Sequence, residues 1–537
     1  MATSLYLINP RPDVPFYFGS EVHAAHGFGK ATLLADAAIA TVAAMAPPDF
    51  TVTLCDDGIS PVDFETTADF VGITGKISQE ERMIELAREF RRRGKVVIFG
   101  GPYASLSPGK LRGECDILVR GELENIAEKF FSDLRSGAWQ REYIGDKPDL
   151  RNSPIPRWDL YRNERALSGT LQTSRGCPFE CEFCDVIQYL GRKQRHKAPD
   201  QVLAELDELY RHGYRMVFLA DDNFTVYRAR AKELLRALIE WNDSRTEGRV
   251  SFSTQVSIDC ARDEEMLKLC SEAGMATLFI GIETPNAASL KETKKRQNIG
   301  VDMVERVGAF PSNGMMVSGG MMVGFDSDTL DIFETQYEFA MSLPVPMFTV
   351  TPLTAEMATP LYTRMEAENR LVERGRERAP LLPWATNIIP KQMSYDELVS
   401  GVRWLCNRLY HPRAFEHRVA RFIDLYQGPQ PRRNPGFQGA PAPREIDRQR
   451  VELARRVSRL GPAEAAMAAR IERRVLQKPA ALPLVLLAIG YYMQTRFMFQ
   501  NSGLWDPKLG EQRKPIFERA HTVPVGVPVP SPAFSIL

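Results

Sequence analysis

Short apolar runs alternate with amphipathic segments through residues 1–140. Strands and helices that alternate in this way predict a doubly wound parallel sheet of the α/β class. Ligands of such a sheet bind beyond the carboxyl ends of its strands. Several of those ends carry Gly, Asn or Asp, which let the backbone approach a large ligand closely. The expected strands are residues 5–8, 51–54, 70–74, 95–99 and 117–119, and the expected helices are residues 31–45, 80–93 and 123–134.

The same alternation returns after a proline-containing connector and gives way to helical patterns beyond residue 360. The expected strands here are residues 170–173, 216–220, 251–258, 278–282 and 315–323, and the expected helices are residues 198–212, 228–241 and 264–273. The predicted organisation is an N-terminal domain at residues 1–140, the connector at 141–168, a second α/β domain at 169–360 and a mainly helical domain at 361–521. Four prolines in residues 522–537 predict a disordered tail.

Composition narrows the class of protein. The chain is 44% hydrophobic and 25% charged, as in ordinary soluble proteins. Lys plus Arg and Asp plus Glu number 68 each, so no bulk charge favours a nucleic-acid partner. Eight cysteines in 537 residues are too sparse for a disulfide scaffold and favour a reducing compartment. The N-terminus lacks the basic and long apolar regions of a signal peptide, so a cytoplasmic protein is expected.

One stretch near the C-terminus is free of charge. Residues 479–495 contain 17 residues without Asp, Glu, Lys or Arg. A membrane span needs ~20 predominantly apolar residues, so the stretch predicts a buried helix and no transmembrane segment. The alternative is a helix that lies on a membrane surface, which would make the protein membrane-associated.

The strongest chemical signal is a group of three cysteines. Cys177, Cys181 and Cys184 follow the spacing C-x-x-x-C-x-x-C. Three thiolates so close together cannot pair as disulfides without leaving one over, whereas thiolates are preferred ligands of iron–sulfur clusters. Unrelated cysteines or half of a zinc site are the alternatives. Zinc wants a fourth ligand, and no C-x-x-C or H-x-x-x-H partner stands elsewhere.

The cysteine motif, with Phe183 before its last cysteine, resembles the signature of the radical S-adenosylmethionine (SAM) enzymes. The resemblance implies a 4Fe–4S cluster held by the three cysteines at the carboxyl end of the first strand of a partial (βα) barrel. The fourth iron of that cluster would bind SAM. A basic run follows at residues 192–197, for which a solvated loop or a contact to a ligand is expected.

The same resemblance assigns further SAM contacts in the barrel. Asp222 and Asn223 follow the second strand and are expected near the methionine amino group. An Asx turn that caps the next helix is the other interpretation, and both can hold together. Glu283 ends the strand whose acidic residue binds the ribose in this family. Gly320 and Gly324 are expected beside the adenine, with tight strand–helix packing as the alternative.

The N-terminal domain resembles the cobalamin-binding domain of one radical SAM subgroup, the class B methyltransferase-like enzymes. Gly100-Gly101-Pro102 and the later Arg120-Gly121-Glu122-x-Glu124 carry the likeness. The cobalt-ligating motif D-x-H-x-x-G is absent, which leaves the lower axial ligand open. A flavodoxin-like domain that binds a nucleotide or no cofactor is the alternative.

The C-terminal third resembles the branch that includes the hopanoid C-2 methyltransferases, at residues 384–391 and 410–421. The resemblance implies methylation of an unactivated carbon of a small molecule, with a hopanoid-like lipid as the candidate. A 5′-deoxyadenosyl radical and methylcobalamin would act, and an electron donor such as flavodoxin or ferredoxin would reduce the cluster. No side chain is expected to act as acid or base. A non-methylating tetrapyrrole oxidative cyclase and a non-enzymatic cofactor sensor are the alternatives, and the SAM-site residues disfavour the sensor.

Overall fold

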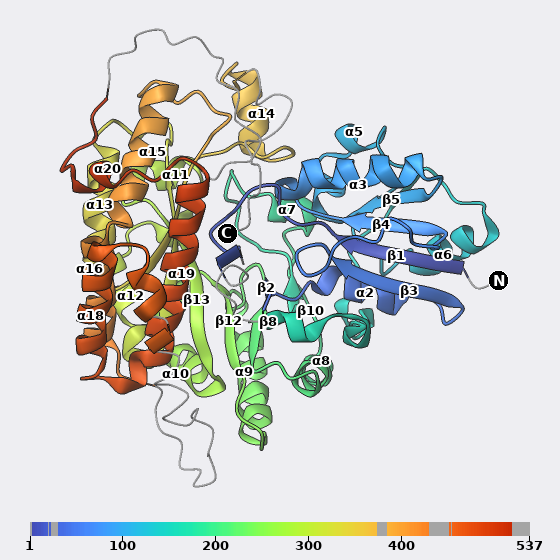
Figure 1. Ribbon diagram of the computed structural model, residues 1–537, viewed down its shortest axis with the longest axis horizontal. Helices are drawn as coiled ribbons and strands as arrows, with labels where there is room; N and C mark the ends of the chain where they lie inside the picture. Colours follow the sequence, from blue (N-terminus) through green and yellow to red (C-terminus); the bar gives the residue numbers. More distant parts are fainter. Residues whose placement is uncertain are drawn as a thin grey trace.

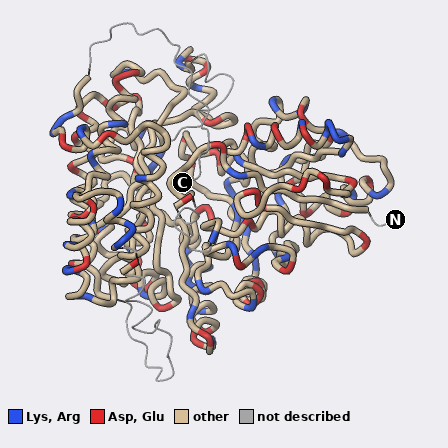
Figure 2. Tube along the Cα trace, viewed as in Figure 1, with Lys and Arg blue, Asp and Glu red and all other residues tan. Residues whose placement is uncertain are grey.

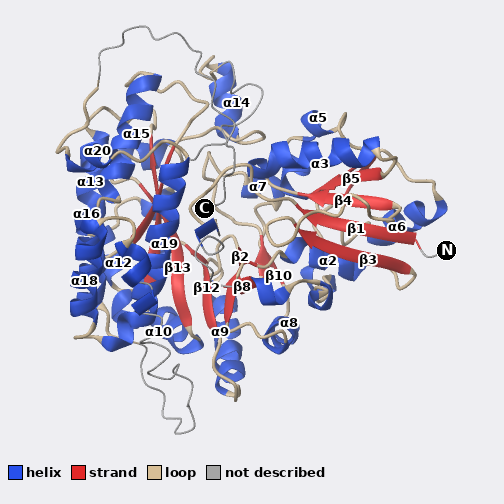
Figure 3. Cartoon of the chain, viewed as in Figure 1, coloured by secondary structure: helices blue, strands red, loops and turns tan. Residues whose placement is uncertain are grey.

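The computed structural model describes residues 3–19, 21–22, 30–372, 384–428, 451–452 and 454–517. The predicted tail at residues 522–537 lies outside these ranges. Figures 1 and 3 show a first sheet at one side, a second sheet in the middle and a group of helices at the other side. The predicted α/β architecture is confirmed.

The first sheet has six parallel strands in the order β3-β1-β4-β5-β6-β7. Their bounds are β1 Thr3–Asn9, β3 Phe50–Asp56, β4 Phe70–Thr74, β5 Val96–Gly100, β6 Ile117–Arg120 and β7 Glu142–Ile144. Helix α3 (Glu80–Arg92) covers one face, where its Met83 and Phe90 pack among buried residues of β4 and β5. Helices α2 (Ala37–Met45) and α6 (Ala127–Ser136) bury the other face. Apolar strands buried on both faces explain the sequence pattern.

The prediction of one helix over residues 31–45 is wrong at its start. Thr32–Leu34 forms a short strand, β2, which pairs with β8 (Ala166–Leu171) of the second sheet. The Asp36 side chain accepts a hydrogen bond from the Ile39 N–H at 2.9 Å, so it caps α2 and the helix begins at Ala37. The N-terminal segment therefore contributes to both sheets.

The second sheet runs in the order β15-β14-β13-β12-β11-β8-β2, and each neighbouring pair is parallel. Its remaining strands are β11 Met216–Leu219, β12 Ser251–Val256, β13 Met275–Glu283, β14 Met316–Val323 and β15 Met347–Pro352. Helices α8 (Pro199–Arg211), α9 (Arg228–Asp243) and α10 (Glu264–Ala273) lie between successive strands, as predicted. At the edge strand β15, the Tyr17 hydroxyl donates to the Val350 carbonyl and accepts from the Val350 N–H, so a side chain occupies groups that a further strand would pair.

The C-terminal helices extend the core of the second sheet. They are α15 Tyr395–Leu409, α16 Pro412–Leu425, α18 Pro462–Val475, α19 Leu482–Asn501 and α20 Pro507–Glu511. Tyr410 donates a 2.6 Å hydrogen bond to the Phe348 carbonyl in β15 and packs edge-on against Phe499 of α19. One segment, Pro479–Asn501, is long and apolar enough to cross a membrane, but 67% of its most apolar window is buried within the protein. Its burial agrees with the predicted core helix.

Candidate cofactor site

The carboxyl ends of the strands of the two sheets face each other. Glu122, after β6 of the first sheet, forms ion pairs with Arg175 and Arg195. These arginines lie in a two-stranded sheet of β9 (Ser174–Arg175) and β10 (Arg195–His196), and β9 follows the carboxyl end of β8. Ser107, which follows β5 and a short helix, contacts the Met357 sulfur after β15 at 3.5 Å. Since α/β sheets bind ligands at these ends, ligands of the two sheets would meet in the region between them.

The three cysteines lie on the loop that follows β8. Cys181 is buried, and Cys177 and Cys184 are partly buried. Burial raises the pKa of Cys177, and it raises the pKa of Cys184 to about 12, so both thiols stay neutral unless a cation or metal stabilises the thiolate. The charges of the three sulfurs would interact with one another.

The donor set suits a cluster better than a single ion. In the described residues, no three His, Cys, Asp or Glu side chains converge as ligands of one metal ion. A four-iron cluster binds each thiolate to a different iron, so its ligands need not converge on one point. Three thiols on one loop, with no fourth ligand supplied by the described residues, therefore fit such a cluster with one open iron.

The loop is held by the acidic residues that follow β11. Asp221 is buried and accepts from the backbone N–H groups of Thr173 and Ser174 at 2.7 and 3.0 Å. Asp222 accepts from the Gly176 N–H at 2.8 Å, directly before the first cysteine. Burial raises the pKa of Asp222 to about 6. Sequence reasoning missed the role of Asp221, which positions the cysteine loop.

Asn223, predicted with Asp222 as a SAM contact, lies deeper. Its side-chain amide donates to the Ser257 hydroxyl at 3.1 Å, and its backbone carbonyl accepts from the side-chain amide of Gln194 at 3.0 Å. The structure thus brings Asp222 to the cysteine loop, whereas the Asn223 side chain joins β11 to the end of β12.

Glu283 ends β13 in a left-handed conformation, with φ of 64°. Non-glycine residues adopt this conformation rarely, and it is often retained at functional sites. Its carboxylate accepts from the Lys295 ammonium at 2.7 Å. Burial opposes the charge of Lys295, but the Glu283 carboxylate, together with negative charge on Cys181 and Cys184 in their thiolate form, outweighs burial and raises the pKa of Lys295. Lys295, which the sequence analysis did not single out, therefore places a cation between Glu283 and the cysteines.

Three of the four predicted glycines, Gly101, Gly320 and Gly324, lie where a side chain would meet neighbouring atoms closely. A Cβ on Gly101 would meet the Thr74 hydroxyl at 2.4 Å, and its φ is 88°, so glycine lets the loops after β4 and β5 approach. Gly100 has more space around it. A Cβ on Gly320 would contact the Phe279 ring at 3.0 Å. Gly324 has φ of 94° and faces Leu398 of α15, so strand–helix packing accounts for it.

A buried ionic network joins the cysteine loop to the first sheet. Arg175 pairs with Glu122 at 2.5 Å and with Glu124 at 2.7 Å, and Arg195 pairs with Glu122 at 2.6 Å. The two carboxylates are 3% and 5% exposed, so each charge depends on its partner. The basic run at residues 192–197 is thus only partly a solvated loop, because Arg195 and Lys197 are ion-paired.

A second group of ion pairs holds the other side of the loop. Glu182, between two of the cysteines, pairs with Arg364 of α14 (Pro360–Ala367) at 2.7 Å. Arg364 also pairs with Asp326 at 2.6 Å. Phe183 packs beside an apolar cluster that contains Leu361 and Met365 of the same helix. Figure 2 shows that residues of both charge signs are interspersed along the chain.

The chain is similar in sequence to known families and proteins. The radical SAM superfamily profile matches residues 171–340, and a domain of unknown function, DUF4070, matches residues 359–497. An uncharacterized methyltransferase of Synechocystis sp., sll1242, is 35% identical over 357 residues, which cover 65% of this chain and 66% of that protein, just under two thirds of its length. The hopanoid C-2 methylase of Rhodopseudomonas palustris is 31% identical over 388 residues, which cover 70% of this chain and 71% of that protein.

A solved structure shows the same fold. The cobalamin-dependent SAM radical enzyme OxsB, solved with aqua-cobalamin bound, superposes with a TM-score of 0.58 at 15% identity and covers 94% of this chain and 82% of its own. The chain belongs to the radical SAM superfamily. Within it, the chain belongs to the family that contains the hopanoid C-2 methylase.

Proposed function

We propose that the protein is a cobalamin-dependent radical SAM C-methyltransferase that methylates an unactivated carbon of a hopanoid-like lipid. The observation that carries the proposal is the opposition of the two sheets, joined by the Glu122–Arg175 ion pair beside the cysteine loop. A cofactor on the first sheet would face a cluster and SAM on the second. When bound, the three cofactors supply the radical chemistry and the transferred methyl group.

The chain's own residues bind and orient these cofactors. Cys177, Cys181 and Cys184 hold the cluster. The Glu283 carboxylate accepts hydrogen bonds from the ribose hydroxyls of SAM, and the Lys295 ammonium beside it offers a positive charge to the carboxylate of the methionine part. Gly100 and Gly101 open the loop after β5 to cobalamin. No acid or base is required at the methylated carbon. A one-electron donor such as flavodoxin or ferredoxin completes the system.

The inner face of the second sheet favours an apolar substrate. Register places Phe279 opposite Gln255 and Ser318, and these positions lie on one face of the sheet. Phe279 packs edge-on against Phe18, which packs in the same way against Tyr491 of α19, and all three rings are partly exposed. Aromatic faces bury the apolar surface of a hydrocarbon polycycle.

The test is genetic and chemical. The gene is deleted in its host, and total lipids and pigments are compared by mass with strains complemented by the wild type or by Cys181→Ala. The expected result is the loss of a lipid one methylene unit heavier than a retained one, restored by the wild type alone. A missing mass among the tetrapyrroles would support an oxidative cyclase instead, and unchanged extracts would contradict both.

A further inference from the structure

Exposed apolar side chains gather at one end of the C-terminal helices. Leu425 at the end of α16 is 40% exposed, Leu476 directly after α18 is 53% exposed and Val451 is 69% exposed. Large apolar side chains cost free energy when they face water, so a local group of them marks an interaction surface.

Contacts place these three residues at the same end. The Lys478 ammonium, beyond α18, donates to the Tyr426 carbonyl at 3.2 Å, which joins the chain after α18 to the end of α16. Val451 stands three positions before Ala454 in the chain, and Ala454 lines an apolar groove together with Val475 at the end of α18. The three apolar side chains therefore surround the ends of two neighbouring helices.

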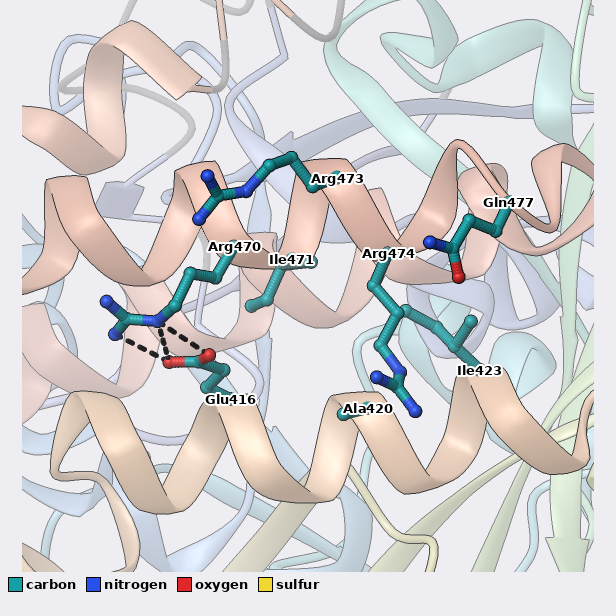
Figure 4. Close-up of a pocket in the computed structure, with 8 residues that line it drawn as sticks. All are labelled: Glu416, Ala420, Ile423, Arg470, Ile471, Arg473, Arg474 and Gln477. Carbon is teal, nitrogen blue, oxygen red and sulfur yellow. Dashed lines mark hydrogen bonds and ion pairs between the residues drawn. The ribbon is translucent and has the colours of Figure 1, made fainter.

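Cations lie beside them. A groove of about 300 Å³ runs between α16 and α18, and Figure 4 shows arginines projecting from α18 along it. Arg474 pairs with Asp424 at 2.5 Å, and both side chains are about half exposed. Arg473 is exposed and forms no ion pair within the described part of the chain. The groove is lined by Glu416, Ala420, Ile423, Arg470, Ile471, Arg473, Arg474 and Gln477.

The charge-free helix cannot provide the membrane contact that its composition suggests. Most of α19 is buried, including Tyr492, which is fully enclosed and packs against Phe415 with ring centroids 4.5 Å apart. Insertion of α19 into lipid would break this packing. A membrane contact must therefore use a surface that is already exposed.

We propose that the surface formed by Leu425, Val451, Arg473, Arg474, Leu476 and Lys478 docks on an anionic phospholipid membrane. Its three cations, Arg473, Arg474 and Lys478, lie beside the carboxylates Asp424 and Glu472, and Glu452 next to Val451 is already paired with Arg455 and Arg456. The remaining excess of cations complements anionic headgroups. The apolar side chains would enter the boundary between headgroups and acyl chains. This inference does not rest on the proposed function, because the surface is distant in sequence from every predicted cofactor ligand.

The experiment is co-sedimentation of the full chain with vesicles. One set is pure phosphatidylcholine and the other is equimolar phosphatidylcholine and phosphatidylglycerol. We expect binding to the anionic set alone, weakened by added salt. Arg473→Gln with Arg474→Gln should reduce partitioning roughly 30-fold, since each cation near an anionic surface contributes about 1 kcal/mol. Leu425→Ser with Leu476→Ser should also reduce it.

A matched control separates the surface from net charge. Arg88→Gln with Arg92→Gln removes two exposed cations from helix α3, which covers one face of the first sheet, and should leave partitioning unchanged. Unaltered circular dichroism and SAM cleavage would show that the variants fold. Absence of binding to anionic vesicles would overturn the proposal. An equal loss of partitioning in the Arg473/Arg474 variant and in the Arg88/Arg92 control would also overturn it. A concentration-dependent dimer that Leu476→Ser abolishes would assign the surface to self-association and would also overturn it.

Discussion

The cysteine loop and the C-terminal helices are both held against the second sheet, but by different kinds of contact. The loop is fixed by carboxylates and cations, among them Asp221, Arg175 and Glu182. The helices are fixed by buried aromatic and aliphatic side chains such as Tyr410 and Phe499. Directional polar contacts fix the position of groups that must meet a ligand, whereas apolar burial supplies stability without specifying a position so closely. The two regions should therefore respond differently to substitution.

The largest loss of stability is expected in the apolar region. Phe499 is fully buried and packs edge-on against Tyr17 and Tyr410, with centroid separations of 6.2 and 5.4 Å. Phe499→Ala should lower the free energy of unfolding by about 3–5 kcal/mol, and Phe499→Leu by less. Urea unfolding measures both. SAM cleavage per folded molecule should be retained at low temperature, and its loss would show that this region also positions the site.

The next effect is expected in the ionic network. Arg175→Ala leaves Glu124 without its cation and should cost about 3 kcal/mol. Unlike Phe499→Ala, it should also lower SAM cleavage and cluster retention in the remaining folded protein, because Arg175 directly precedes the cysteine loop. The control is Arg157→Ala, whose exposed pair with Asp159 contributes ~0–1 kcal/mol. Normal iron content and cleavage in Arg175→Ala would remove the distinction between the two regions.

A smaller effect is expected for Glu283. Glu283→Gln should weaken SAM binding by about 1–3 kcal/mol while iron content is unchanged, because a buried hydrogen-bonding carboxylate is lost. The variant also leaves Lys295 without its 2.7 Å partner. A double-mutant cycle with Lys295→Met, read by SAM titration, separates these contributions. Wild-type affinity in Glu283→Gln would make Glu283 a structural residue at the end of β13.

The smallest effect is expected on the outer side of the loop. Arg364 is more exposed than Arg175, so Arg364→Ala should cost only about 1 kcal/mol. It should nevertheless accelerate loss of iron in air, because α14 covers Glu182 and Phe183. Absorbance of the reconstituted cluster over time measures this rate. A rate equal to that of the wild type would show that the apolar contacts of α14 hold the loop without Arg364.

Local patterns predicted most of the strands and the cysteine motif. Alternating apolar runs located the parallel strands within a few residues, and the spacing of Cys177, Cys181 and Cys184 placed them on one loop after β8. The pairing of Thr32–Leu34 with β8 was missed because it depends on contact across more than a hundred residues of chain. When the partner strand β8 is unknown, the pattern of an apolar segment next to several alanines predicts a helix.

The ionic contacts of the site could not be predicted for the same reason. Glu122 belongs to a motif that the sequence shows, but its pairing with Arg175 depends on how the first sheet is placed against the cysteine loop. Lys295 lies in a lysine-rich stretch that resembles a solvated surface, and only the fold shows it enclosed with Glu283. The role of Asp221 was overlooked beside Asp222 because sequence alone does not show that both carboxylates accept hydrogen bonds from the backbone of the cysteine loop.

The central claim is that the cysteine loop holds a cluster that cleaves SAM. The most direct measurement is the amount of 5′-deoxyadenosine formed when anaerobically reconstituted protein is mixed with SAM and dithionite. Wild-type protein should form it, and Cys184→Ala should form none, while both show the same circular dichroism. Equal amounts from the two proteins, or none from a wild type that retains its iron, would contradict the claim.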